Sequence, residues 1–163
     1  MVEDLHNIKD SIKAVDEQIE SICMEYTEYN YLLSIPGFGP DISSKVLGAI
    51  GNALRFDNGK QVLKLVGFDL NASRSGKTSG SAVPRISKRG NAHLRYALYQ
   101  AALIASSRNR YFKRYYNNQL CGREREKGIK IKMKVKLAAK MLMIAWTLMK
   151  KKEPFDPTYL NMG

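Results

Sequence analysis

The sequence has few residues of the kinds that bind metals or form disulfides, with two cysteines and two histidines among 163 residues. Cys23 and Cys121 make no metal-binding pattern, and two cysteines are too few for a disulfide framework. We therefore expect a reducing cytoplasm in which both cysteines are passive fillers. The sequence also lacks an apolar run of about 18 residues and anything that resembles a signal peptide, so we expect no membrane partner.

Carboxylates are scarce over most of the chain. Residues 31–163 hold seven acidic residues against 25 basic ones, whereas residues 1–30 hold eight acidic residues and two lysines. The net charge is +12 overall, made up of −6 before residue 31 and +18 after it. The electrostatic field of so much positive charge attracts polyanions and indicates a nucleic-acid partner. The alternative is a basic surface kept for solubility. A two-metal nuclease needs clustered carboxylates, so the sequence predicts no metal site in this chain.

The acidic N-terminal segment has a heptad pattern. Its apolar residues are separated by alternating steps of three and four, which is typical of a coiled coil held for about four heptads. They are Leu5, Ile8, Ile12, Val15, Ile19, Ile22, Tyr26, Tyr29 and Leu33. We expect residues 1–30 to form a long coiled-coil helix that makes a homo-oligomer. The alternatives are packing on the body of the same domain and pairing with a segment outside this sequence.

A glycine-containing turn follows the heptads. Pro36-Gly37 and Gly39-Pro40 mark a tight turn between two helices, and this order predicts a helix-hairpin-helix motif. In such a hairpin the glycines let the backbone approach a phosphate, and amide groups at the next helix start bind it. We therefore expect Gly37 and Gly39 to contact a nucleic-acid backbone, with a plain interhelical turn as the alternative.

The rest of the chain is expected to be helical, apart from one long loop. A short helix capped by Asp57 or Asn58 ends near Gly67, and residues 69–90 lack hydrophobic periodicity. Loops of this length are usually functional or disordered, and we expect this one to be mobile. Helices resume after Gly90. In Ile129–Leu137, however, apolar residues alternate with lysines, and this period of two also fits a strand. The predicted fold is mainly α: a coiled-coil helix over 1–30, a compact helical domain over 31–153 with the hairpin and the long basic loop, and a tail over 154–163.

The long loop has the residues best suited to attack a phosphodiester. Ser75 lies between Arg74 and Gly76-Lys77, so a hydroxyl, positive charge and an accessible backbone coincide. Such surroundings stabilise the charge that gathers on a phosphoryl group. Ser73, Ser79 and Ser81 are nearby competitors, and a flexible linker is the alternative for any Ser-Gly step in a basic loop.

Four basic residues precede or begin the next helix: Arg85, Lys88, Arg89 and Arg95. Guanidinium groups together with helix-terminal amides make an anion site, with a basic cap on a solvent face as the alternative. His93 is a weaker candidate for proton transfer. Aromatic and basic residues alternate in Arg108–Tyr116 and can stack on nucleic acid, although Tyr111 and Tyr115 also fit a core. The stripe of Lys132, Lys136 and Lys140 fits phosphate contact or solvation.

These motifs resemble those of a known family. Their order and spacing over about residues 30–150 resemble the C-terminal transposase domain of the IS "one-ten" insertion-sequence family, which includes Piv-type invertases and bridge-RNA-guided recombinases. The matching segments are Leu33-Ser-Ile-Pro-Gly-Phe-Gly-Pro, Leu65-Val-Gly-Phe-Asp, Ser75-Gly-Lys and Arg85-Ile-Ser-Lys-Arg-Gly-Asn-Ala-His-Leu-Arg95.

The resemblance implies a serine recombination mechanism. In such proteins a C-terminal domain supplies a serine that attacks DNA and becomes covalently linked to it, and the matching residue here is Ser75. It implies that Arg74, Lys77, Arg85, Lys88, Arg89 and Arg95 hold phosphates or stabilise the transition state. It further implies DNA and a bridge RNA as partners, a bacterial or archaeal cytoplasm, and Mg²⁺ in a RuvC-like domain absent from this sequence. We therefore expect no cofactor in this chain and no activity from it alone; a non-catalytic binding and oligomerisation module is the alternative.

Overall fold

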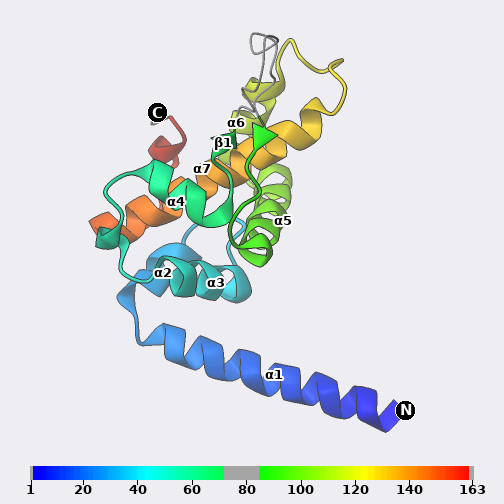
Figure 1. Cartoon of the computed structure of the whole chain (residues 1–163), viewed down its shortest axis with the longest axis vertical. Coiled ribbons are helices and arrows are strands. Elements are labelled where there is room, and N and C mark those ends of the chain that lie inside the picture. The colour runs from blue at the N-terminus through cyan, green and yellow to red at the C-terminus, as the bar shows by residue number, and fades with distance from the viewer. Residues whose placement is uncertain (1, 72–84, 162–163) are drawn as a thin grey trace.

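The computed structural model describes residues 2–71 and 85–161, and within them it is mainly helical (Figure 1). The α-helices are α1 (Val2–Met24), α2 (Thr27–Leu33), α3 (Pro40–Ile50), α4 (Gly59–Val66), α5 (Ala92–Arg108), α6 (Arg110–Leu120) and α7 (Ile129–Lys151). Two 3₁₀ turns, η1 (Ala53–Arg55) and η3 (Pro157–Leu160), complete the helical elements. Two short strands, β1 (Leu70–Asn71) and β2 (Arg85–Ile86), pair antiparallel. The predicted mainly α class is therefore confirmed. Among these elements no helix is both long and apolar enough to cross a membrane.

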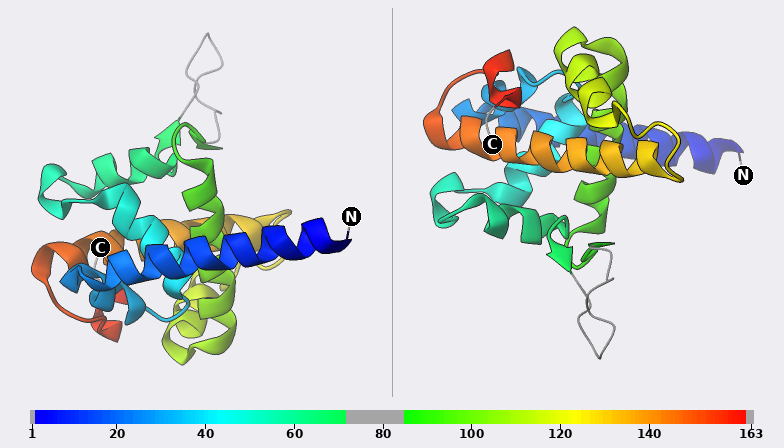
Figure 2. Two further views of the ribbon diagram at one scale, coloured as in Figure 1. Left: turned by 90° about the horizontal axis from the view of Figure 1, so that it is seen from below. Right: turned by 90° about the horizontal axis from the view of Figure 1, so that it is seen from above.

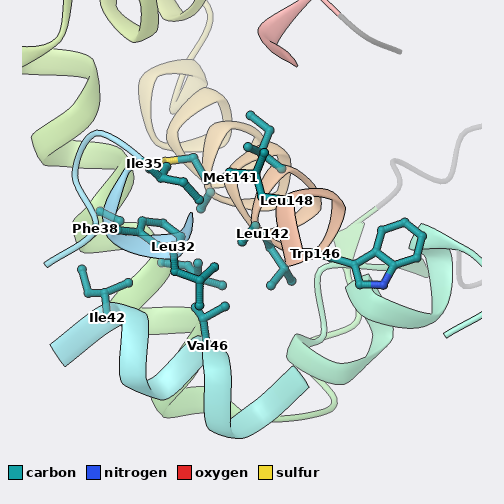
Figure 3. Packing of buried hydrophobic residues seen from close by; sticks show 14 of the residues in the cluster. Leu32, Ile35, Phe38, Ile42, Val46, Met141, Leu142, Trp146 and Leu148 are labelled. Carbon is teal, nitrogen blue, oxygen red and sulfur yellow. The ribbon is translucent and has the colours of Figure 1, made fainter. Parts of the chain in front are cut away.

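Helices α5 and α7 form the centre of the core. The small residues Ala101 and Ala102 on α5 are fully buried, which lets the two helices approach closely. Side chains of α2, the following turn and α3 face those of α7, including Met141 and Leu142 (Figure 3). Trp146 closes one end of this core, where its indole Nε1–H donates to the carbonyl of Ala53 at 2.9 Å.

The start of α7 forms the helix that the sequence predicts after Gly90, and not the alternative strand. Ile129 and Met133 are buried, and so is Leu137 one turn later, while the lysines between them lie toward solvent to varying degrees. The spacing of four places one residue per turn on the core side, which is the helical period. Burial on that face explains why an alternating sequence folds as a helix here.

Helix α1 projects from the body and presents its apolar stripe to solvent (Figures 1 and 2). Seven large apolar side chains between Leu5 and Tyr26 that belong to the heptad pattern are each 42–58% exposed. The helix ends at Met24, earlier than the heptads predict, and Tyr29 and Leu32 lie in the core on α2. Because Tyr29 has no exposed area, the stripe ends at Tyr26. Oligomerisation through this stripe remains a prediction.

The residues expected to form a C-terminal tail pack against the body. Tyr159 and Leu160 of η3 are buried, and the Phe155 ring stacks on Phe112 of α6 with centroids 5.5 Å apart. The backbone N–H of Phe155 donates to Ser34 Oγ at 2.8 Å, which ties this segment to the end of α2. The packing of Phe155, Tyr159 and Leu160 explains why the segment folds onto the core.

Candidate nucleic-acid interface

The predicted loop over 69–90 has an ordered base. Leu70 pairs with Ile86 and Asn71 with Arg85, so the two ends of the intervening segment are held side by side. The Ser87 N–H donates to the carbonyl of Asp69 at 2.8 Å, and the Ser87 hydroxyl donates to the Asp69 carboxylate at 2.6 Å. No local pattern indicates this Asp–Ser pair, because the two residues are 18 positions apart in the sequence.

Two glycines let the backbones at the loop base cross closely. Gly67 and Gly90 have φ of +73° and +121°, in the region that favours glycine. A Cβ on Gly90 would lie 2.5 Å from the carbonyl oxygen of Leu65, and one on Gly67 would collide with the backbone of Arg89. The N–H of Asn91 donates to the Leu65 carbonyl at 3.0 Å and closes the crossing. This backbone crossing fixes where the loop leaves and re-enters the body.

Arg95 links the two sides of the loop base. Its Nη1 donates to the carbonyl of Val66 at 2.8 Å and to the carbonyl of Lys88 at 3.3 Å. The side chain is half-buried in the first turn of α5, whose start is capped by Asn91. The guanidinium is therefore engaged with backbone on both sides, and this contact suits a positioning residue better than a free phosphate ligand.

Three other predicted basic residues lie exposed at the same place. Arg85, Lys88 and Arg89 all present side chains to solvent, and Lys88 has a positive φ of +56° that turns the backbone there. His93 is exposed on the first turn of α5 nearby in sequence. The structure thus brings Arg85, Lys88, Arg89 and Arg95 together around the strand pair. We call this group the loop base.

Replacing Arg85, Lys88 and Arg89 together with alanine should weaken duplex DNA binding and reduce its dependence on salt. Each neutralised phosphate contributes roughly 0.9 to the slope of log K against log salt, so the slope should fall by up to about 2.7. Fluorescence anisotropy over a salt series measures it. The matched control removes three exposed cations from the far end of α7, at Lys150–Lys152. An equal fall in slope for both variants would contradict a local interface.

The proposed nucleophile lies outside the described residues. Ser75 and its neighbours Arg74 and Lys77 belong to residues 72–84, between the two paired strands. The described residues show the paired strands that precede and follow this segment. The role of these three residues remains a prediction.

The hairpin glycines lie apart from the loop base. Gly37 has φ of +93° and packs on α5, where a Cβ would lie 2.7 Å from the carbonyl oxygen of Ala101 and 3.1 Å from the Cβ of Ala105. Those alanines are six and ten residues beyond Arg95, or roughly 9 to 15 Å along the helix. Gly39 has open space around it. The contact of Gly37 with α5 explains that glycine by packing, whereas Gly39 leaves its backbone accessible.

Substitution of Gly37 by alanine should destabilise the fold by about 2–4 kcal/mol, since it combines a left-handed backbone with overlap against α5. Gly39→Ala is the matched control and should cost less than about 1 kcal/mol, because the site is open and glycine at a helix N-cap gives only a modest advantage. Urea denaturation followed by circular dichroism measures both. Equal losses would show that the contact with α5 does not explain Gly37.

The aromatic and basic residues of α6 divide between core and surface. Phe112 is fully buried, whereas Tyr111 is 38% exposed and Arg114 is exposed. Burial raises the pKa of the Tyr115 hydroxyl. On α7, Lys132 and Lys136 of the predicted stripe are exposed, whereas Lys140 is partly buried.

Carboxylates do not cluster in the described part of the chain. Within residues 2–71 and 85–161, no group of three or more His, Cys, Asp or Glu side chains is placed to hold a metal ion. The Asp69 carboxylate accepts the Ser87 hydroxyl.

Comparison with known proteins identifies a family and two relatives of this chain. A sequence profile described as "Transposase IS116/IS110/IS902 family" matches residues 29–117, from α2 into α6. The chain is 29% identical over 160 residues to the "Pilin gene-inverting protein" of Moraxella lacunata and to that of Moraxella bovis. Each alignment covers 94% of this chain and 48% of the relative. The chain thus spans about half the length of these relatives.

Proposed function

Because this chain belongs to the IS116/IS110/IS902 transposase family, we propose that it is the DNA-binding, nucleophile-bearing part of an insertion-sequence recombinase. Family membership supports a role in DNA recombination. The observation that carries the finer proposal is the loop base, which gathers three exposed cations where the serine-bearing segment joins the body. A recombinase needs both functions at one place, since it must hold a phosphate and attack it.

The proposed reaction is a phosphoryl transfer to Ser75. Its Oγ attacks the phosphorus of one DNA strand, an Oγ–P bond forms, and the bond from phosphorus to a deoxyribose oxygen breaks. The serine proton is released, and the leaving oxygen takes up a proton. Reversal by a deoxyribose hydroxyl of the second DNA restores a phosphodiester and frees the serine. Arg74, Lys77, Arg85, Lys88 and Arg89 would stabilise the charge that develops on the phosphoryl oxygens.

We further propose that this chain acts with a RuvC-like half, and we call the two together the complete recombinase. The relatives are about twice as long as the aligned region, and the described residues offer no clustered carboxylates. Mg²⁺ held by the other half would supply Lewis-acid activation of a phosphate. A guide RNA and oligomerisation through the exposed stripe of α1 are parts of the same proposal.

One assay separates this function from its rival, a non-catalytic module that clamps DNA or RNA and oligomerises. The complete recombinase is incubated with labelled substrate DNA, denatured, and resolved by gel electrophoresis. A labelled species that survives denaturation and disappears on protease treatment supports nucleophilic catalysis. The non-catalytic module is favoured if DNA binding is steeply salt-dependent but no protein–DNA adduct forms under conditions that support strand exchange.

A further inference from the structure

Helix α6 and η3 enclose a cavity that the loop base does not include. Its volume is about 350 Å³, at the lower end of the range for pockets that hold small ligands. From α6 it is lined by Tyr111, Arg114, Tyr115 and Asn118. On the other side it is lined by Pro157, Thr158 and Leu160 of η3 and by Asn161, which follows η3. We call it the α6–η3 pocket.

The α6 side of the pocket is one face of the helix. Residues 111, 114, 115 and 118 follow the spacing i, i+3, i+4 and i+7, which places them on the same side. Phe112, about 100° round the helix from Tyr111, lies in the core, where it stacks on Phe155. Packing of Phe112 therefore fixes the rotation of the helix and turns the two tyrosines and the arginine toward η3.

The groups in the pocket suit a planar ring that carries a phosphate. Tyr111 is 38% exposed, and the Arg110 guanidinium lies 4.6 Å from its ring centroid and donates to its hydroxyl at 2.5 Å. The amides of Asn118 and Asn161 can both donate and accept hydrogen bonds. Aromatic faces combined with arginine and amides are the chemistry that binds unpaired bases.

The charge of this surface also favours an anionic ligand. Helix α6 has three basic residues, Arg110, Lys113 and Arg114, and no acidic residue, and Arg108 at the end of α5 adds a fourth positive charge nearby in sequence. The residue that caps η3 is an acid, Asp156, whose carboxylate already accepts the N–H of Thr158 at 2.8 Å. Hydrogen bonds from the side chain and then the backbone of Thr158 lower the pKa of Asp156 and direct the carboxylate into its own turn.

The pocket lies at the opposite end of α5 from the loop base. Helix α5 runs from β2 to α6, and the views in Figure 2 place the strand pair and α6 on opposite sides of the body. The hairpin end of α2 is on the same side as the pocket, because Ser34 accepts the N–H of Phe155. The pocket and the loop base are therefore separated by about the length of α5, which has 17 residues and spans roughly 26 Å.

We propose that the α6–η3 pocket binds one unpaired nucleotide of a single strand, with the base against Tyr111 and the phosphate on Arg114. The strand is either displaced DNA or RNA, since both present the same base and phosphate chemistry. This gives the chain two nucleic-acid contacts, one for duplex at the loop base and one for a single strand at the other end. The inference concerns binding and does not depend on catalysis by Ser75.

The test uses the 163-residue chain and short single strands that contain 2-aminopurine, whose fluorescence is quenched when it stacks on an aromatic ring. Quenching is expected, and Tyr111→Ala or Arg114→Ala should weaken binding by about 5- to 150-fold. Matched controls are Tyr96→Ala, a tyrosine 66% exposed on α5, and Arg125→Ala in the turn after α6. Tyr111→Leu keeps an apolar side chain without a π face and should lose quenching while the melting temperature is kept.

Two further arms make the outcome decisive. A strand with an abasic site should bind more weakly, and a duplex of the same sequence should show no quenching that depends on Tyr111. Higher affinity for either the DNA or the RNA strand supports the proposal and shows which of the two the pocket binds. Equal losses in pocket and control variants, or unchanged affinity for the abasic strand, would overturn it. Strand cleavage is not needed, so a failed adduct assay would leave this result interpretable.

Discussion

Ser75→Ala in the complete recombinase should abolish the covalent DNA adduct and reduce strand exchange by at least about a thousandfold, because alanine has no atom that can bond to phosphorus. Duplex binding should change little, since the exposed cations of the loop base remain. Strand exchange is measured with two labelled DNA substrates, and binding by anisotropy on the same preparations.

The other serines of the same segment provide matched controls. Ser73→Ala and Ser79→Ala remove a hydroxyl from the same basic stretch and should retain most strand exchange. If Ser75→Ala keeps exchange while one of these loses it, the nucleophile has been assigned to the wrong position. If all three variants remain active, the serine mechanism itself is wrong for this chain.

Arg95→Met should reduce strand exchange by about 10- to 100-fold while duplex affinity stays within about fivefold. The arginine joins the carbonyls of Val66 and Lys88 across the loop base, and loss of these bonds loosens that connection. Misplacement of a reacting group by about an ångström can itself cost a hundredfold. The same change should cost about 1–3 kcal/mol of stability, since it removes two hydrogen bonds that the guanidinium donates to backbone carbonyls.

The salt dependence of binding separates this positioning role from direct phosphate contact. If Arg95 only positions the loop base, the slope of log K against log salt should be unchanged in Arg95→Met. If Arg95 holds a phosphate, the slope should fall by roughly 0.9. Circular dichroism at the assay temperature checks that the variant is folded. A fall in slope without a fall in exchange would contradict the positioning role.

The helices and the family could be predicted from the sequence because both depend on local patterns. Periodicity located the helical segments, and burial of Ile129 and Met133 explains why an alternating stretch forms one of them. The motifs around Ser75 and Arg85 matched a family whose profile covers residues 29–117. Spacing and residue type were sufficient for these conclusions.

What the sequence could not show depends on contacts between distant segments. Tyr29 continues the heptad pattern, yet it is buried because α2 turns onto the core after the break at residues 25–26. Arg95 is a residue type that commonly binds phosphate, but its guanidinium donates hydrogen bonds to carbonyls seven and 29 residues away. From the sequence, Gly37 fitted either a phosphate-binding hairpin or a plain interhelical turn. The close approach of α5 explains why glycine is needed at this position.

The central claim is that Ser75 becomes covalently joined to DNA. The most direct measurement is to trap the adduct formed by the complete recombinase, digest protein and DNA, and identify the modified peptide by mass spectrometry. A nucleotide phosphate attached to the peptide that contains Ser75, with fragments that place it on that residue, is the predicted result. An adduct on any other residue, or strand exchange with no covalent intermediate, would contradict the account.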